Sequence, residues 1–575
     1  MKRLLALFLA LCLLLGGCSG AEMLHRILRK DRGTFARIVS TIRNYDTLRP
    51  FPDMPYESPD AQELNGVFGK ARTLAEQGED ADALIAALDR AFDAYNQFYT
   101  LDTIAMIRSD ADQTDEYYRS EYDRCEVMTA QVEQWREQML RACAASSLRP
   151  VLEHRGYFGP GELDEYEGEE AFDDAIVALY QRESELLAEY RTLMADDAVE
   201  IDGNTMSLNE YLARESLSEE EYRDAYLAWL EKVNGEAAGI YAELLGVRIE
   251  MAEAMGYDSY EQYCYDYYYR DYTPDEARDW LEEIRRELGP YRQSLFDTGE
   301  YDKLDYPVLS ERLLRSYLGD VMDSLGGAAS EAFNFMCDYE LWDVTPDMRK
   351  APVSYTVYLY SYDTPYLFAD TYGDIEDLLT VSHEFGHFLA GYSLGIWDTP
   401  LDLDETWSQG MEFLTLEGLR DMLPNYDELL RIKLLGAVDA YTTQASYSAF
   451  EQAVYALPES ERTAERFNEL FLETQRDYGL IDGDEETAAL WWTQVDHLFE
   501  MPFYVVSYCT SADASMQLYQ LALEDPEEAW DAYNVLMEQW DQPFADALAE
   551  AGLESPMEPG HAKRARETIE AQLPD

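Results

Sequence analysis

Most of the chain follows a helical pattern of apolar and polar residues. In segments such as 80–94, 117–145 and 172–194, apolar residues recur three and four positions apart, with acidic residues between them. This spacing places the apolar side chains on one face of a helix, where they can pack against a neighbour. No repeat of 20 to 50 residues is present, so a solenoid is not expected. The pattern predicts a mainly α-helical protein.

Two short stretches depart from the helical period. Residues 199–204 are typical of a turn between two extended pieces, and 354–368 alternates β-branched and aromatic residues, which predicts one or two strands. Composition also shifts mildly near residue 200. We therefore divide the mature chain into an N-terminal helical region, 19–200, and a second region, 201–575.

The first 18 residues have the pattern of a targeting signal. Lys2 and Arg3 precede an almost unbroken apolar run, 4–15, which is too short to span about 30 Å of hydrocarbon. The run ends in Leu-Gly-Gly-Cys, which resembles a bacterial lipoprotein signal in which Cys18 is lipidated. The alternative is an ordinary secretory signal cleaved nearby. We expect a chain in the cell envelope, held at the outer face of a bacterial membrane only through a lipid on Cys18.

Charge limits the partners of this chain. Asp and Glu number 116 against 44 Lys and Arg, a formal net charge of −72. Such a surface repels the phosphate backbone, so nucleic acid is excluded as a partner. Anionic headgroups are repelled in the same way, so attachment to a membrane requires an anchor.

The cysteine pattern does not predict a fold held together by disulfide bonds. Five follow Cys18, which is an odd number, and they are widely spaced without a C-x-x-C pair. We expect most of them to be buried as small apolar side chains. They are Cys125, Cys143, Cys264, Cys337 and Cys509.

The segment His383-Glu384-Phe385-Gly386-His387 carries the chemistry. Residues four apart share a face of a helix, so His383 and His387 can bind one metal ion. Glu384 follows the first ligand and can act as general base on a water molecule. With only six His in the chain, roughly 0.01 chance matches to H-E-x-x-H are expected. The motif predicts a zinc hydrolase.

Catalytic zinc takes three protein ligands, and no third His follows closely. The third ligand should therefore be a carboxylate from a later helix. Periodicity favours Glu405, because Ser408, Gln409 and Glu412 share its helical face and can form a polar surround. The candidates are Asp402, Asp404, Glu405, Glu412 and Glu417.

Three segments resemble the thimet oligopeptidase and oligoendopeptidase F family of zinc metallopeptidases. They are 365–387, which ends in the metal-binding motif, 405–412, which begins with Glu405, and His497 together with 503–508. The resemblance implies one zinc ion per chain, with Glu405 as the third ligand. This sequence departs from the family pattern in one respect, because the interval from His387 to Glu405 is shorter than expected.

The resemblance also implies residues that stabilise the transition state. His497 with Tyr504 or Tyr508 has the chemistry to donate hydrogen bonds to the oxyanion of a tetrahedral intermediate. Phe503 lies at a slightly shifted distance from His497, so the choice between the two tyrosines stays open. A strand rim at 365–370 is expected to pair with substrate backbone by strand addition.

The family implies a two-lobed helical fold around a deep channel, with a small sheet beside the zinc helix. Its substrates would be short unfolded peptides, cut at internal bonds. One alternative is an exopeptidase on the same scaffold, releasing dipeptides or single residues. Another is a lipid-anchored peptide- or metal-binding protein without catalysis, which the intact Glu384 disfavours because a binder needs no general base. The sequence does not define the oligomeric state.

Overall fold

The structure is a computed structural model. It describes residues 48–159, 161–166, 174–201, 203–212, 214, 217–395, 399–481 and 484–574. The predicted signal, 1–18, and its Cys18 lie outside these residues. Within the described part, every helix is too short or too polar to cross a membrane.

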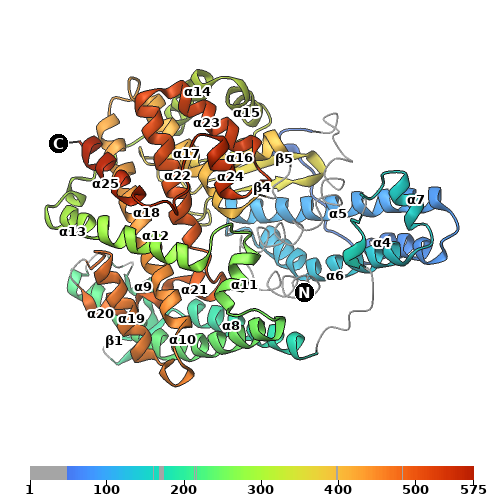
Figure 1. Ribbon diagram of the computed structural model, residues 1–575, viewed down its shortest axis with the longest axis horizontal. Helices are drawn as coiled ribbons and strands as arrows, with labels where there is room; N and C mark the ends of the chain where they lie inside the picture. Colours follow the sequence, from blue (N-terminus) through green and yellow to red (C-terminus); the bar gives the residue numbers. More distant parts are fainter. Residues whose placement is uncertain are drawn as a thin grey trace. The chain divides into compact units, whose positions relative to one another are not determined.

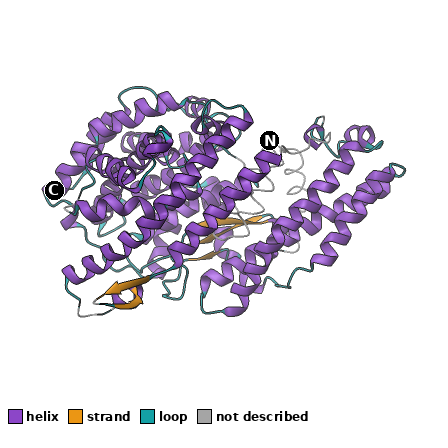
Figure 2. Ribbon diagram, turned by 90° about the horizontal axis from the view of Figure 1, so that it is seen from below, coloured by secondary structure: helices purple, strands orange, loops and turns teal. Residues whose placement is uncertain are grey.

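The chain forms two compact units, and each is assembled from separate stretches of sequence. Unit 1 comprises the described residues of Met1–Asp174, Tyr306–Asp398 and Thr415–Pro424. Unit 2 comprises those of Ala175–Asp305, Thr399–Leu414 and Asn425–Asp575. Both units are built mainly from helices with small sheets (Figure 2), which confirms the predicted helical fold class. The expected deep channel and the division near residue 200 stay predictions.

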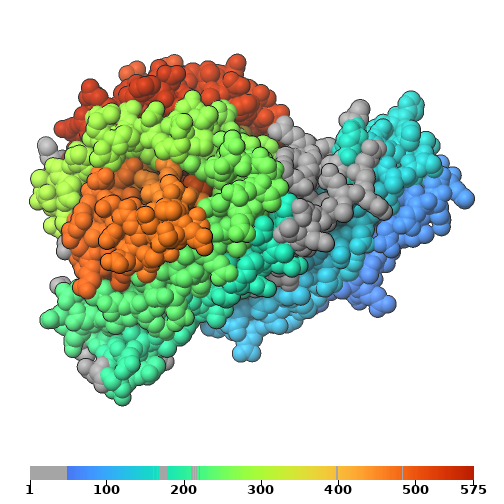
Figure 3. Space-filling model, turned by 60° about the horizontal axis from the view of Figure 1, so that its bottom comes forward, coloured from blue at the N-terminus to red at the C-terminus, as the bar shows by residue number. Residues whose placement is uncertain are grey.

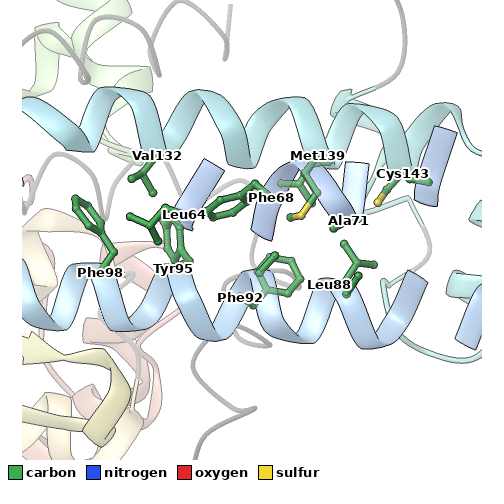
Figure 4. Close-up of a cluster of buried hydrophobic side chains, with 14 of the residues drawn as sticks. Leu64, Phe68, Ala71, Leu88, Phe92, Tyr95, Phe98, Val132, Met139 and Cys143 are labelled. Carbon is green, nitrogen blue, oxygen red and sulfur yellow. The ribbon is translucent and has the colours of Figure 1, made fainter. Parts of the chain in front are cut away.

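Unit 1 begins with three packed helices. Asp60, Asp80 and Asp115 each accept backbone N–H groups at the start of one of them. Apolar residues from all three helices meet in one core, shown in Figure 4, which includes Phe68, Phe92 and Met139. The helices of unit 1 are α4 (Ala61–Gln77), α5 (Ala81–Ala111), α6 (Glu116–Ala145), α7 (Arg149–His154), α14 (Glu311–Leu325), α15 (Gly327–Asp338) and α16 (Asp377–Leu394).

Unit 1 also contains a three-stranded sheet, with strand order β3-β5-β4. β4 (Tyr355–Leu359) and β5 (Thr364–Phe368) are antiparallel and confirm the strands predicted at 354–368. β3 (Trp342–Asp343) is parallel to β5, and its two residues are too few to produce a visible alternation in the sequence. β4 and β5 lie beside α16 (Figure 1).

The sheet corrects the place expected for strand addition. Within the rim at 365–370, Leu367 and Phe368 of β5 already pair with β3 on one side and β4 on the other. Peptide backbone cannot pair with groups that are already bonded within the sheet. The outer strand beside β5 is β4.

Unit 2 contains most of the remaining helices and a small hairpin. β1 (Ala198–Ile201) pairs with β2 (Asn204–Ser207), which confirms the turn predicted at 199–204. The helices are α8 (Asp174–Ala195), α9 (Leu208–Leu212), α10 (Glu219–Met255), α11 (Tyr260–Tyr267), α12 (Pro274–Glu287), α13 (Gly289–Asp297), α17 (Leu401–Leu419, through Leu414), α18 (Tyr426–Tyr455), α19 (Ala464–Asp477), α20 (Glu485–Leu490), α21 (Asp496–Glu500), α22 (Val506–Glu524), α23 (Pro526–Glu538), α24 (Phe544–Glu550) and α25 (His561–Gln572).

Helix α18 is central to unit 2, where it contacts α12, α13, α19 and α22. In the space-filling view, the orange region of α18 to α20 lies against the green region of α10 to α13 (Figure 3). The five cysteines in the described part carry free thiols. Four are buried and Cys337 is half-buried, as expected for packing residues.

Candidate metal centre and catalytic residues

A carboxylate determines where α16, the helix of the H-E-x-x-H motif, begins. Asp377, in the first turn of α16, accepts the backbone N–H groups of Tyr372 and Gly373 at 2.9 Å and of Asp374 at 3.2 Å. A negative charge is also favoured at this end by the helix dipole. Gly373 has φ of 78°, a conformation in which a side chain would be strained. The turn and the carboxylate together fix the start of α16.

The two motif histidines lie on one face of α16. The ring centroids of His383 and His387 are 5.3 Å apart, as the i, i+4 spacing predicts. The other face is apolar, where Phe385 and Phe388 are buried and Phe385 packs edge-on against Phe333 at 5.7 Å. Burial of this face holds the histidine face in a fixed rotation.

Glu384 is buried between the helix and the sheet. Its side chain and backbone both face Thr356 of β4, whose Oγ1 lies 3.1 Å from Glu384 Oε2 and 2.8 Å from its carbonyl oxygen. Only 6% of Glu384 is exposed. A single hydroxyl hydrogen therefore serves either the carboxylate or the carbonyl. The sequence does not predict this contact, because the pattern around Thr356 indicates only that the residue belongs to a strand.

Glu405 lies on α17, which packs closely on other helices of unit 2. A Cβ at Gly410 would come within 2.8 Å of Leu518 Cδ1, so the glycine lets α17 approach α22 without displacing that side chain. The hydroxyl of Ser408, one turn along, lies 3.1 Å from Glu405 Oε2 and 2.9 Å from the Glu405 carbonyl oxygen, and it can donate to either. This contact belongs to the polar surround that periodicity predicted for Glu405. Of the other predicted members, Gln409 donates instead to Ser511 at 3.2 Å.

The structure brings the three predicted ligands together. One nitrogen of His383, one nitrogen of His387 and one carboxylate oxygen of Glu405 lie within 4.8 Å of one another. Among the described residues, no other group of three His, Cys, Asp or Glu side chains meets this criterion. Two imidazoles and one carboxylate are a donor set of catalytic zinc, with a fourth position left for water. The residues therefore fit the metal that the motif predicts.

The other candidate carboxylates are engaged elsewhere or lie outside this group. Asp402 is fully buried and accepts hydrogen bonds from Tyr272, at 2.9 Å, and Thr510. Glu412 pairs with Lys433 at 2.7 Å, and Glu417 pairs with Arg420 at 2.7 Å. Asp404 does not join the ligand group.

His497, Tyr504 and Tyr508 form one cluster. The His497 ring centroid lies 5.6 Å from that of Tyr504 and 6.1 Å from that of Tyr508, and the tyrosine rings are 5.3 Å apart. His497 Nδ1 bonds Asp496 Oδ1 at 2.8 Å, and this bond chiefly lowers the pKa of Asp496. Because a carboxylate accepts, Nδ1 carries the hydrogen and Nε2 is left for other chemistry.

The tyrosine segment is bonded to the helix that carries Glu405. Thr510, on α22, donates to Asp402, while Ser515 donates to the carbonyl of Thr406 at 3.4 Å. Gln409 reaches Ser511 of the same helix. Since Tyr508 lies in the first turn of α22, these bonds fix the tyrosine helix against α17.

Comparison with known proteins identifies the fold. The family described as Peptidase M3 N-terminal domain matches residues 51–158. PZ peptidase A, solved with an inhibitor, is 21% identical with a TM-score of 0.69, over 91% of this chain and 99% of that one. A Bacillus anthracis chain described as an oligoendopeptidase F is 22% identical with a TM-score of 0.66, over 91% and 98%.

A third structure has the same fold at lower similarity. Oligoendopeptidase F from Enterococcus faecium is 15% identical with a TM-score of 0.55, over 89% of this chain and 96% of that one. A search of curated proteins finds no match. The family domain and the shared fold confirm the resemblance that the sequence motifs carried.

Proposed function

We propose that this chain, a metallopeptidase of the M3 type by its N-terminal domain and fold, hydrolyses internal bonds of short unfolded peptides. The observation that carries the proposal is the convergence of His383, His387 and Glu405, with Glu384 beside the first histidine. Two imidazoles and a carboxylate would hold zinc, and the ion when bound would supply Lewis-acid activation of water and of the scissile carbonyl.

Glu384 is the proposed general base. It would take a proton from the attacking water and later pass it to the leaving amine. Its burial and its contact with Thr356 restrict the carboxylate to few orientations, which favours a group that must meet its proton at hydrogen-bond distance. Ser408 restricts the Glu405 carboxylate in the same way.

His497 with Tyr504 or Tyr508 would stabilise the oxyanion of the tetrahedral intermediate. All three donate hydrogen bonds through groups that can act on developing negative charge. Tyr508 is half-buried, whereas only 2% of Tyr504 is exposed. Support comes from their clustering and from the hydrogen bonds that join their segment to α17.

The proposal includes location. We propose that Cys18 is acylated after removal of the signal and that the enzyme works outside the cytoplasm at a membrane face. The n-region, the apolar run and the Leu-Gly-Gly-Cys ending support this. Full-length protein should partition with membranes and Cys18→Ser should not; equal detergent partitioning of the two would contradict the anchor.

Cleavage of a defined peptide library by residues 22–575, read by mass, tests the activity. Products cut at internal bonds are expected, and they should vanish with a chelator and return with zinc. Glu384→Gln is the matched control, because it keeps the shape but lacks the base; turnover should fall by at least about 100-fold. Release of only dipeptides or single terminal residues would indicate the exopeptidase instead. Unaltered peptides would contradict catalysis.

A further inference from the structure

We propose that two buried side chains, those of Glu451 and Arg270, position the Phe503–Tyr504 backbone and so hold the catalytic tyrosines in place. Neither residue belongs to the metal group or to the His497 cluster. Both bond the chain at adjacent residues, immediately before the tyrosine helix α22. The inference rests on the function proposed for Tyr504 and Tyr508.

Glu451 holds a strained residue. Phe503 has φ of 58°, a left-handed conformation that costs a non-glycine residue of order 1 kcal/mol or more. Its N–H donates to Glu451 Oε1 at 2.7 Å, and its ring packs on Tyr455 at 4.8 Å. Glu451 is only 1% exposed, so water does not compete for this bond. The acceptor oxygen of Glu451 thus stabilises a backbone conformation that is unfavourable for a phenylalanine.

Arg270 holds the next residue. Its Nη2 donates to the carbonyl oxygen of Tyr504 at 3.3 Å and to Ser507 Oγ at 2.9 Å. A guanidinium presents its donors in a rigid plane, so two contacts from one nitrogen fix both direction and distance. Glu451 therefore holds the peptide unit before Phe503, and Arg270 holds the peptide unit after Tyr504.

The tyrosine-rich segment 257–272, which contains Arg270, explains how this side chain is held. The guanidinium carbon lies 4.6 Å from the ring centroid of Tyr265, 4.8 Å from that of Tyr268 and 6.0 Å from that of Tyr272. Its Nε and Nη1 are buried and make no hydrogen bond to any residue in the described part of the chain. Cation–π attraction replaces hydrogen bonds on these faces. The segment therefore packs around Arg270.

The arrangement matters for a transition-state donor. An oxyanion donor must lie within a few tenths of an ångström of its position, and a displacement of 1 Å can cost about 100-fold in rate. A strained turn without its anchors would relax toward common backbone conformations. Loss of either anchor should therefore reduce kcat and leave KM nearly unchanged.

The test uses the unsubstituted protein, residues 22–575, as the parent, together with a peptide that this parent cleaves. Glu451→Leu has similar volume but no acceptor, whereas Glu451→Gln keeps an acceptor oxygen. Arg270→Lys keeps the charge without the planar fork. Each is made in the parent and in the Tyr504→Phe/Tyr508→Phe background, with metal content and the unfolding midpoint measured alongside. We expect Glu451→Leu and Arg270→Lys to lower kcat about 10- to 100-fold in the parent, with Glu451→Gln close to parent.

The double background separates positioning from general destabilisation. If the anchors act through the tyrosine hydroxyls, their loss should lower kcat less than about threefold once those hydroxyls are absent. Equal losses in both backgrounds would overturn the inference. So would a parent-like kcat for Glu451→Leu and Arg270→Lys.

Glu283 provides a matched control. It is also a buried glutamate of unit 2 that accepts backbone N–H groups, from Gly560 at 2.9 Å and Ala562 at 3.1 Å, but it lies away from the tyrosine segment in sequence and bonding. Glu283→Leu should lower the unfolding midpoint and leave kcat unchanged. A fall in kcat equal to that of Glu451→Leu would overturn the inference.

A second measurement does not depend on activity. Hydrogen–deuterium exchange of the segment 501–508 should accelerate in Glu451→Leu and in Arg270→Lys, and not in Glu283→Leu. Unchanged exchange there would overturn the positioning role, even if the variants were less active. If the parent cleaved no peptide, the proposed function would be contradicted. Hydrogen–deuterium exchange of 501–508 would still test whether Glu451 and Arg270 position this segment. If Glu451→Leu does not fold, Arg270→Lys still tests the positioning role.

Discussion

Thr356 of β4 is hydrogen-bonded to Glu384 of α16, with its Oγ1 3.1 Å from Oε2 and 2.8 Å from the carbonyl oxygen of that residue. The bond joins the outer strand of the sheet to the proposed base, which is next to the proposed ligand His383. A β-branched hydroxyl residue has few χ1 rotamers in a strand, so the donor is already oriented. The sheet thus contributes to the orientation of the base as well as to the packing of the helix.

Thr356→Val should lower kcat by about 10-fold, the scale of one hydrogen bond to a charged group. Valine keeps the shape and removes the hydroxyl, whereas Thr356→Ser keeps the hydroxyl and should restore most of kcat. Thr364→Val on β5 is the matched control, because Thr364 is buried and, within the described residues, its hydroxyl bonds only the carbonyl of Pro365 at 3.3 Å. Steady-state kinetics at measured metal content checks this. Equal losses in the Val and Ser variants would show that the hydroxyl is not the cause.

Glu405→Gln should abolish stoichiometric zinc, because a neutral amide is a poor replacement for a carboxylate ligand. Glu412→Gln is the control on the same helix, since Glu412 is paired with Lys433 at 2.7 Å and should leave zinc in place. Metal analysis after dialysis measures both. Full zinc in Glu405→Gln would exclude Glu405 as the third ligand and return the choice to Asp402, Asp404 or Glu417.

Tyr504→Phe and Tyr508→Phe should separate the two candidate donors. Phenylalanine keeps the ring packing and removes only the hydroxyl, and loss of one oxyanion donor costs about 100- to 1,000-fold in kcat. One variant should show this fall with KM and zinc content unchanged, and His497→Ala should lower kcat as well. Wild-type kcat in both Tyr variants would mean that these rings are core packing. A rise in KM alone would mean that they bind substrate in the ground state.

The parts of the site that the sequence predicted are those with local spacing. The i, i+4 histidines are neighbours on any helix, and Ser408 reaches Glu405 because residues three apart share a face. The strands at 354–368 and the turn at 199–204 likewise follow from short-range alternation. Such features need no knowledge of the tertiary fold.

The parts that the sequence could not predict depend on distant residues. Thr356 meets Glu384 across 28 positions and Glu451 meets Phe503 across 52. Nothing in their local patterns distinguishes them from other strand or helix residues. β5 is the central strand of the sheet because β3 pairs with it on one side. β3 has only two residues, which are too few to show an alternating pattern in the sequence. The segment 257–272 is rich in tyrosine, but its packing around Arg270 depends on the fold.

Glu451 should make the stability of the protein depend on pH. Burial raises its pKa from 4.5 to about 8, although the Phe503 N–H, Arg248 and Arg270 lower it; nearby Glu261 adds to the rise. Between these pH values the folded state binds more protons than the unfolded state, so stability falls as pH rises from about 5 to about 8. Glu451→Gln cannot titrate, so it should lose this contribution. The unfolding free energy of wild type relative to the variant should fall by at most about 1.4 kcal/mol per pH unit in that range. Thermal melts of both proteins between pH 5 and 8 measure the difference in unfolding free energy. The contributions of all other carboxylates are the same in both proteins and cancel in this difference. A difference that stays constant with pH would mean that Glu451 is ionised in the folded protein throughout this range.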